Sequence, residues 1–328
     1  VGMAAPHLLP GFFELGFVLV LAAILLVIRT RRLFWVVPVA GAAVAGFAVY
    51  ASYQQIDAYG ENIVASARNF YGTLRVRDLG GPDEVRTLNH GAIRHGGQIR
   101  QPEERRRAPT TYYGPDSGAG AVITALQSRR ANIRVGVIGL GTGTIAAYGR
   151  PGDVFRFYDI NSQVIDFAQR YFTFLGDSRA NIELALGDAR LSLEREPGQK
   201  LDVLAIDAFS GDSVPAHLLT VEALAVYVRH LKPDGVLLFH ITNRYLDLLP
   251  VVKMIAESRG MSAVLIEHEP TDAEEENDLL SNSDWVAVAR DQATIKLPEI
   301  AARIKDITLP RGATVWTDDY NNLIRVLK

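Results

Sequence analysis

The sequence RVGVIGLGTGT (134–144) joins a short apolar run to a turn that has glycine at every second position. Gly139, Gly141 and Gly143 would let the backbone approach a bound ligand closely. We expect a helix to begin directly after this turn, where its N-terminus would favour a polar or anionic group. A glycine triplet alone does not identify a ligand site, so the flanking sequence has to support it.

From about Ala119 onward, apolar runs alternate with helical stretches. This alternation predicts an α/β domain with a parallel sheet that is covered by helices on both faces. The expected strands are residues 133–141, 154–160, 182–188, 201–207, 235–242, 262–267 and 284–290.

Three of these strands end on an acid. Asp159 follows Gly139 by 20 residues, the position from which a carboxylate reaches a ribose diol in nucleotide-binding domains. Asp188 and Asp207 end the next two strands. A single acid of this kind is more often a helix cap or a turn residue. The ordered set after a glycine-rich turn instead favours a ligand site at the carboxyl edge of the sheet.

The composition narrows the classes of function. The chain has 328 residues, of which 48% are hydrophobic and 22% charged, and its formal net charge is −3. This is enough chain for one large domain or two modest ones. The near-neutral charge argues against a nucleic-acid partner. Because cysteine is absent, disulfides, thiol catalysis and Cys-ligated zinc are excluded, and we predict no metal site.

The N-terminal part predicts two transmembrane helices. Residues 11–28 and 33–51 are each close to the roughly 20 apolar residues that cross a bilayer. A cleaved signal peptide would have one shorter stretch, and the alternative is a pair of buried core helices. The connecting loop contains Arg29, Arg31 and Arg32, which the positive-inside rule would place in the cytoplasm. That would put the C-terminal domain outside.

Three domains are expected: the two transmembrane helices (1–53), a linker with a small β region (54–118) and a Rossmann-like domain (119–328). Residues 54–70 have the pattern of a linker or an amphipathic helix, whereas residues 71–100 have the texture of β-hairpins. The acidic stretch TDAEEEND (271–278) is expected to be a solvated loop that could attract a cationic amine.

The spacing of the glycines, GxGxG, favours an adenosyl-sulfonium ligand over a dinucleotide. Together with YDINSQVIDFAQRYF (158–172), GDAR (187–190), DAFSGDSVPAHLLT (207–220) and WTDDYNNLIRVL (316–327), the turn resembles the spermidine synthase (polyamine aminopropyltransferase) family. The resemblance covers about four-fifths of the chain and is greatest to the membrane-fused bacterial branch. It implies a class I adenosylmethionine-dependent methyltransferase-like fold.

The resemblance also implies roles for particular residues. The three glycines would hold the amino-acid end of the sulfonium nucleotide. Asp159 would hold the ribose hydroxyls, Asp188 would bond the adenine amine, and Gln98 would lie over the ligand. The co-substrate would be decarboxylated S-adenosylmethionine or S-adenosylmethionine itself.

Asp207 matches the family's acid that acts on the incoming amine. A carboxylate there can accept the proton that a protonated amine must lose before it attacks. Tyr113, or its neighbour Tyr112, is a candidate catalytic partner by hydrogen bonding. The family's second acid is replaced by Ser210, and Asp212 is the candidate substitute. The family's Tyr-His-Glu run is also lost, because residues 113–115 read Tyr-Gly-Pro.

These departures leave three alternatives open: an aminopropyltransferase-like enzyme, a methyltransferase, and an accessory subunit with weakened catalysis. We favour the first, a transferase with a small-molecule amine as acceptor and the lipid bilayer as a partner. A homodimer or a membrane-protein partner is a further expectation. Use of a cytosolic nucleotide favours a bacterial inner-membrane protein whose catalytic domain faces the cytoplasm, although the loop arginines indicate the opposite side.

Overall fold

The computed structural model describes residues 62–91, 93–208, 215–307, 309 and 313–328, with scattered positions between 21 and 50. The chain divides into two compact units, Val1–Asp78 and Leu79–Lys328. No helix within these described residues combines the length and apolar character needed to cross a bilayer. Asp212 and most of the two predicted spans lie outside the described residues.

The first unit contains an antiparallel pair of strands, β1 (Ile63–Asn69) and β2 (Gly72–Asp78). The prediction of a linker or an amphipathic helix is therefore wrong for residues 63–69. In a strand, β1 satisfies its backbone groups by pairing with the segment that follows it, a contact that local residue pattern does not reveal.

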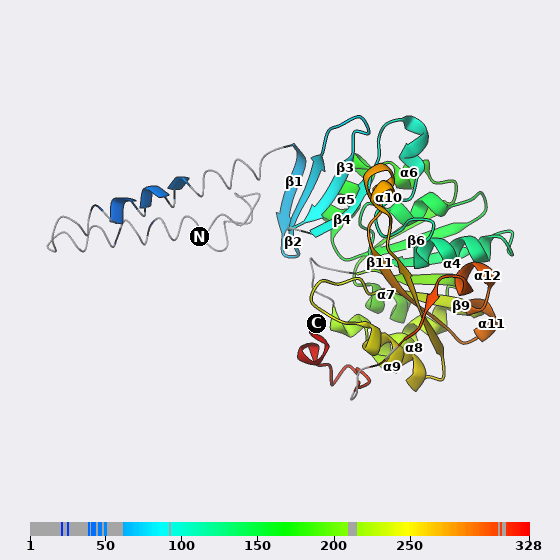
Figure 1. The fold of residues 1–328 in the computed structure, drawn as a ribbon. Coiled ribbons are helices and arrows are strands. Elements are labelled where there is room, and N and C mark those ends of the chain that lie inside the picture. Colours follow the sequence, from blue (N-terminus) through cyan, green and yellow to red (C-terminus); the bar gives the residue numbers. More distant parts are fainter. Residues whose placement is uncertain are drawn as a thin grey trace. The chain divides into compact units, whose positions relative to one another are not determined.

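The second unit begins with a hairpin and continues into a mixed sheet. The hairpin pairs β3 (Arg86–His90) antiparallel with β4 (Ile93–Gln98). The strands of the sheet are β5 (Arg134–Ile138), β6 (Val154–Asp159), β7 (Asn181–Leu186), β8 (Leu201–Ile206), β9 (Leu231–His240), β10 (Ser262–His268), β11 (Ser283–Ala289) and β12 (Ile304–Lys305). Their order across the sheet is β12-β10-β11-β9-β8-β5-β6-β7. Figure 1 labels β6, β9 and β11 of this sheet.

The predicted parallel sheet is confirmed for β5 to β9, which pair in parallel. It is wrong for the last strands, because β11 runs antiparallel to both β9 and β10. An antiparallel neighbour needs no crossover across a face of the sheet, and the chain from β10 returns as its neighbour β11 after a connection that contains the helix α10 (Asp272–Asp278). The apolar pattern of β11 is the same for either direction, so the sequence could not reveal it.

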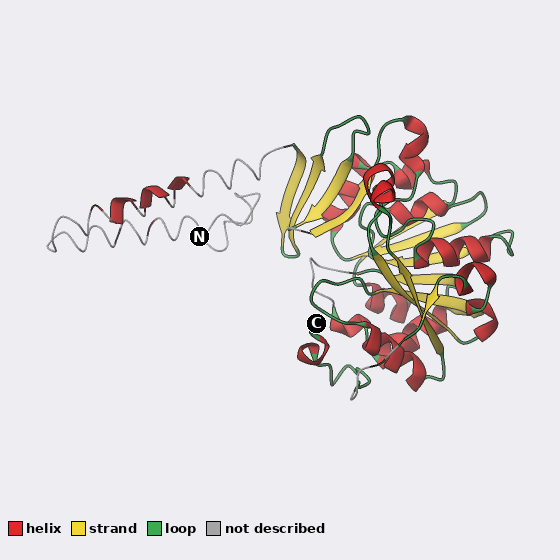
Figure 2. Cartoon of the chain, viewed as in Figure 1, coloured by secondary structure: helices red, strands yellow, loops and turns green. Residues whose placement is uncertain are grey.

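Helices cover both faces of the sheet (Figure 2). One face is covered by α4 (Gly118–Gln127), α5 (Ser162–Tyr171), α11 (Gln292–Ile295) and α12 (Pro298–Ala301), and the other by α7 (Ala189–Arg195), α8 (Val221–His230) and α9 (Leu249–Ser258). Successive residues of β8 point to opposite faces of the sheet. Val203 and Ala205 pack in the core under α4 and α5, whereas Leu204 and Ile206 pack in the core under α7, α8 and α9. This two-sided burial explains why β8 is apolar throughout.

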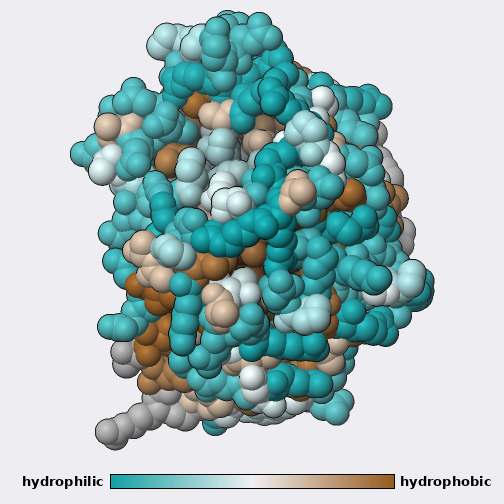
Figure 3. Space-filling model, turned by 90° about the vertical axis from the view of Figure 1, so that its right-hand side faces the viewer, coloured by the Kyte–Doolittle hydropathy of each residue, from teal (hydrophilic) through white to brown (hydrophobic). Residues whose placement is uncertain are grey.

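The acidic stretch 271–278 is not the loop that we expected, because Asp272–Asp278 form the helix α10. A capping box starts it: the Thr271 side chain accepts from the backbone of Glu274, whose carboxylate accepts from the Thr271 backbone. The Thr-x-x-Glu spacing was visible in the sequence. The face of the molecule in Figure 3 is largely hydrophilic, with smaller hydrophobic areas between the polar side chains.

Candidate active site

The glycine-rich turn and Asp207 meet where the order of the strands reverses. From β5 the chain proceeds to β6 on one side, and it returns through β8 on the other. The Asp207 backbone N–H donates to the carbonyl of Ile138, the last residue of β5, at 2.8 Å. Such a reversal at the carboxyl ends of parallel strands is the usual ligand position in open α/β sheets.

Two glycines of the turn are required by close approach of other backbone segments. Gly139 has φ +98°, and a Cβ there would lie 2.2 Å from the carbonyl oxygen of Asp207. Gly141 has φ +54°, and its Cβ would lie 2.7 Å from the carbonyl oxygen of His95 in β4. The helix that we expected after Gly143 is a 3-10 helix, Thr144–Tyr148, which ends at Gly149. The helix-dipole argument is therefore weaker than the sequence suggested.

Asp159 is the last residue of β6 and ties this strand to the glycine-rich turn. Its Oδ2 accepts from the Leu140 N–H at 3.0 Å, and its Oδ1 accepts from the Asn161 N–H at 2.8 Å. Burial raises the pKa of Asp159 to about 6, against the opposing effect of these two donors. A carboxylate has about four acceptor positions, so it retains capacity for further donors.

Asp207 follows β8, and its carboxylate is almost fully buried. One oxygen, Oδ1, lies 2.6 Å from Nδ1 of His240, the last residue of β9. The other oxygen accepts a short hydrogen bond from the hydroxyl of Tyr113. The structure thus brings together two of the predicted catalytic residues, Asp207 and Tyr113, and adds a histidine that we did not predict.

The hydrogen bonds around His240 fix its tautomer. Because a carboxylate oxygen accepts hydrogen bonds, Nδ1–H of His240 donates to Asp207. Nε2 then accepts from the hydroxyl of Thr242, at 2.9 Å, while Thr242 Oγ1 accepts from the backbone N–H of Asp284, at 2.7 Å. This chain of bonds holds the imidazole so that one nitrogen faces the carboxylate.

Aromatic rings pack against the histidine. His240 stacks with Tyr112, at a centroid distance of 4.4 Å, and with Trp285, at 4.7 Å. Burial raises the pKa of Tyr113 well above its ordinary value, and the charge of Asp207 raises it further. The Tyr113 phenol therefore stays protonated at neutral pH and acts as a hydrogen-bond donor to Asp207.

The two other predicted ligand contacts already have partners within the protein. Gln98 is buried; its Nε2 donates to Thr173 Oγ1 at 2.8 Å, and its Oε1 accepts from the Thr173 N–H. Asp188 caps α7 by accepting from the Leu191 N–H at 2.9 Å, and its second oxygen lies 3.0 Å from Nε2 of His217. A ligand contact for either residue stays a prediction.

Sequence reasoning missed two histidines at this edge. His240 lies two residues before the end of the expected strand 235–242 and is the last residue of β9, but we considered acids alone as strand-end candidates. His95 is in β4, and its Nε2 is buried without a hydrogen-bond partner among the described residues. Burial lowers the pKa of His95 to about 4, and the neighbouring His90 contributes. A search for polar residues of any kind near the ends of successive strands, in place of acids alone, would have found His240.

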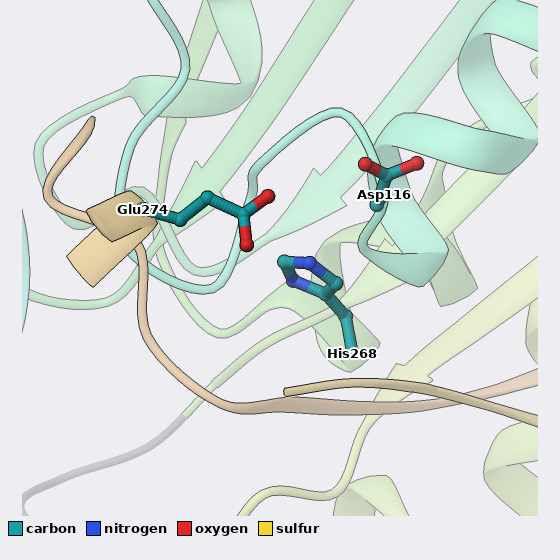
Figure 4. Close-up of side chains that lie close together, drawn as sticks. All are labelled: Asp116, His268 and Glu274. Carbon is teal, nitrogen blue, oxygen red and sulfur yellow. The ribbon is translucent and has the colours of Figure 1, made fainter. Parts of the chain in front are cut away.

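A separate cluster has donor atoms within 4.8 Å of one another: Asp116, His268 and Glu274. Figure 4 shows the His268 ring turned toward the two carboxylates. Asp116 already accepts from the Arg303 guanidinium, with Nε at 3.1 Å, and Glu274 accepts from Thr271. Because a guanidinium occupies the cation position beside Asp116, we assign this cluster to ion pairing and helix capping.

Comparison with known proteins begins with sequence. No family model matches the chain. A polyamine aminopropyltransferase of Vibrio vulnificus is 36% identical over 109 residues, which are 32% of this chain. The match spans 36% of that relative, little more than a third of its length.

Solved structures resemble a larger share of the chain. A probable spermidine synthase from Corynebacterium glutamicum superposes with a TM-score of 0.52 at 17% identity, covering 69% of this chain and 79% of that one. The spermidine synthase from Thermotoga maritima superposes with a TM-score of 0.52 at 14% identity, covering 79% of this chain and 82% of that one. The chain therefore has the Rossmann-like, methyltransferase-type α/β fold that is found in solved spermidine synthases.

Proposed function

We propose that this chain is a spermidine synthase-like aminopropyltransferase, which moves an aminopropyl group from decarboxylated S-adenosylmethionine to a small-molecule amine. One observation carries the proposal. The backbone of Asp207 lies directly against Gly139 of the glycine-rich turn at the strand reversal, and its carboxylate is held by His240 and Tyr113. The partial likeness to a polyamine aminopropyltransferase supports the same reading.

The residues at this edge fit a sulfonium nucleotide. The buried carboxylate of Asp159 retains acceptor capacity for a ribose diol beyond its two backbone donors. Oε1 of Gln163, in the first turn of α5, is buried and has no hydrogen-bond partner among the described residues. A ribose hydroxyl close to Asp159 could supply the missing donor. At Gly139 and Gly141 the absence of a Cβ lets the carbonyl oxygens of Asp207 and His95 approach the turn.

The proposed chemistry places one task on each side chain. The nucleotide supplies a carbon activated by the neighbouring sulfonium. Asp207 accepts a proton from the incoming ammonium, because a protonated nitrogen has no lone pair for attack. His240 and Tyr113 each donate to one carboxylate oxygen and so orient Asp207 toward the amine. A general base of this kind typically contributes 10²–10⁴-fold to the rate.

His240 is proposed as a positioning residue, and its replacement tests this. His240→Leu is expected to lower kcat about 10–100-fold, because Asp207 loses the donor that orients it. The KM for the nucleotide should stay unchanged. His240→Asn restores an N–H near the position of Nδ1 and should recover part of the lost kcat. Equal losses in both variants, or a matching rise in nucleotide KM, would assign His240 to structural packing alone.

The pKa of Asp159 predicts that nucleotide affinity depends on pH. Since burial raises this pKa to about 6, the carboxylate that accepts the ribose hydroxyls is lost as the pH falls below that value. The Kd for methylthioadenosine is expected to rise about tenfold from pH 7.5 to pH 5, as the ionised fraction falls to roughly a tenth. Calorimetry at both values checks this. Asp159→Asn should bind weakly with no such dependence, and an equal dependence in this variant would contradict the assignment.

Product analysis tests the proposed reaction directly. The protein should release methylthioadenosine from decarboxylated S-adenosylmethionine when an amine is present. With intact S-adenosylmethionine the same assay should give little S-adenosylhomocysteine. Methyl transfer without aminopropyl transfer would instead identify a methyltransferase.

We also propose that residues 11–28 and 33–51 anchor this domain in the inner membrane, on the basis of their sequence. Use of a cytosolic nucleotide favours the cytoplasmic side. Protease treatment of intact spheroplasts should leave the C-terminal domain uncut. Cleavage of this domain from outside would contradict the cytoplasmic location. It would agree with the orientation that the loop arginines indicate under the positive-inside rule.

A further inference from the structure

A cavity of about 370 Å³ lies beside the Asp207 network, in the second unit of the chain. It is lined from β4, from the segment after β9 and from the loop before β11. His240, whose Nδ1 lies 2.6 Å from Asp207 Oδ1, forms part of its lining, as does Tyr112. A molecule in this cavity would therefore be close to the carboxylate that we propose as the base.

The charged side chains that line this cavity are cationic. Arg94 comes from β4 and Arg244 follows β9, and both are exposed at the cavity. No carboxylate among the described lining residues faces them, and neither forms an ion pair in the described part of the chain. Tyr112 lines the same cavity as Arg94 and Arg244.

His95 adds an independent indication of a ligand. His95 lines the cavity, and its buried Nε2 has no hydrogen-bond partner among the described residues. Because its pKa is lowered to about 4, mainly by burial, the ring is neutral at physiological pH. An unpartnered polar atom in a buried position is uncommon in folded proteins. A polar group of the occupant would complete it.

We propose that this cavity binds an acceptor amine that carries a negatively charged group at its other end, an ω-amino acid, in preference to a diamine. The proposal rests on the proposed function and names the class of its acceptor. The second ammonium of a diamine would face two guanidiniums, whereas a carboxylate would pair with them, and arginine suits a carboxylate because of its planar fork of donors. The amine end would then lie toward Asp207 and His240.

The reaction balances with these groups. Asp207 first takes one proton from the incoming ammonium. The neutral amine nitrogen then forms a bond to the aminopropyl carbon that is attached to the sulfonium. The carbon–sulfur bond breaks, and its electron pair goes to sulfur, which leaves as the neutral thioether of methylthioadenosine. The nitrogen keeps its two other protons and is a secondary ammonium in the product. The product is an N-aminopropyl amino acid, with the carboxylate unchanged.

A matched pair of acceptors tests the inference. 5-Aminopentanoate and 1,4-diaminobutane share a chain of four methylenes and differ in the terminal group. With decarboxylated S-adenosylmethionine, methylthioadenosine release should show a kcat/KM at least tenfold higher for 5-aminopentanoate. The double variant Arg94→Gln, Arg244→Gln should have a KM for 5-aminopentanoate that is at least tenfold higher than that of the wild type. Its KM for 1,4-diaminobutane should be unchanged or lower. Arg259→Gln is the control, since Arg259 is exposed and donates to the carbonyl of Val221.

The outcomes separate this inference from the proposed function. Turnover of the diamine alone, equal in wild type and double variant, would overturn the inference and leave the transferase intact. If no amine is turned over, the proposed function fails, and saturation-transfer NMR with 5-aminopentanoate still tests the cavity. Binding that the double variant loses and Arg259→Gln retains would support the site. No binding to the wild type would overturn it.

Discussion

Asp207→Asn is expected to lower the turnover number by at least about 10²-fold and as much as 10⁴-fold, with little change in affinity for methylthioadenosine. The amide keeps the shape of the carboxylate but cannot accept the proton of the incoming amine. It also presents an N–H₂ group to His240 or to Tyr113, each of which donates to the wild-type carboxylate. Single-turnover release of methylthioadenosine measures the loss.

Methylthioadenosine affinity serves as the test of folding for this variant, since binding needs an intact sheet edge. Asp166→Asn is the matched control, because Asp166 is an exposed carboxylate of α5 that pairs with Arg170. Exposed pairs of this kind contribute little, so its turnover should equal that of the wild type. Retention of full turnover in Asp207→Asn would remove Asp207 from the proposed role.

Gly139→Ala is expected to destabilise the protein by about 2–5 kcal/mol and to abolish activity. An L-residue at φ +98° costs about 1–2 kcal/mol, and forced overpacking typically costs a further 1–3 kcal/mol. The added Cβ would lie 2.2 Å from the carbonyl oxygen of Asp207, a backbone atom that cannot rotate away. The strain would therefore move the catalytic carboxylate itself. Urea unfolding followed by circular dichroism measures the effect.

Gly260→Ala separates the two causes. Gly260 has φ +66°, but a Cβ there would meet no atom within 4 Å. This control should lose only about 1–2 kcal/mol and keep full activity. If the two variants lost equal stability, the close approach of Asp207 to the glycine-rich turn would not be a feature of the folded protein.

The strand ends could be predicted because they depend on local pattern. Each apolar run from β5 to β8 is short and is followed by glycine or a polar residue, so Asp159 and Asp207 could be placed at the carboxyl edge. The helices between them have apolar residues at helical spacing. These features are local in sequence, and the structure places both acids as expected.

The partners of the acids could not be predicted, since they come from distant segments. Tyr113 reaches Asp207 across 94 residues and His240 across 33, through the packing of separate elements. Tyr113 was one of two tyrosines, with Tyr112, that the sequence offered as hydrogen-bonding partners, and only the structure shows which of them reaches Asp207. His240 was missed because an acid, not a histidine, was sought at each strand end. Strand direction and pairing, as in β1 and β11, likewise depend on tertiary contacts.

The charge of the cavity beside Asp207 could not be predicted from the sequence either. From the sequence, the acidic stretch 271–278 indicated attraction of a cationic amine. In the structure this stretch forms the capped helix α10, and the cavity beside Asp207 is lined by Arg94 and Arg244 instead. These two arginines are 150 residues apart in sequence. Their shared cavity appears only once β4 and the segment after β9 are placed in the fold.

Calorimetric titration with decarboxylated S-adenosylmethionine, S-adenosylmethionine and methylthioadenosine tests the central claim most directly. We predict that methylthioadenosine and the decarboxylated nucleotide bind one site per chain, and that Asp159→Asn weakens both at pH 7.5. Absence of binding by all three nucleotides to the folded wild-type protein would contradict the assignment of this sheet edge to a sulfonium nucleotide.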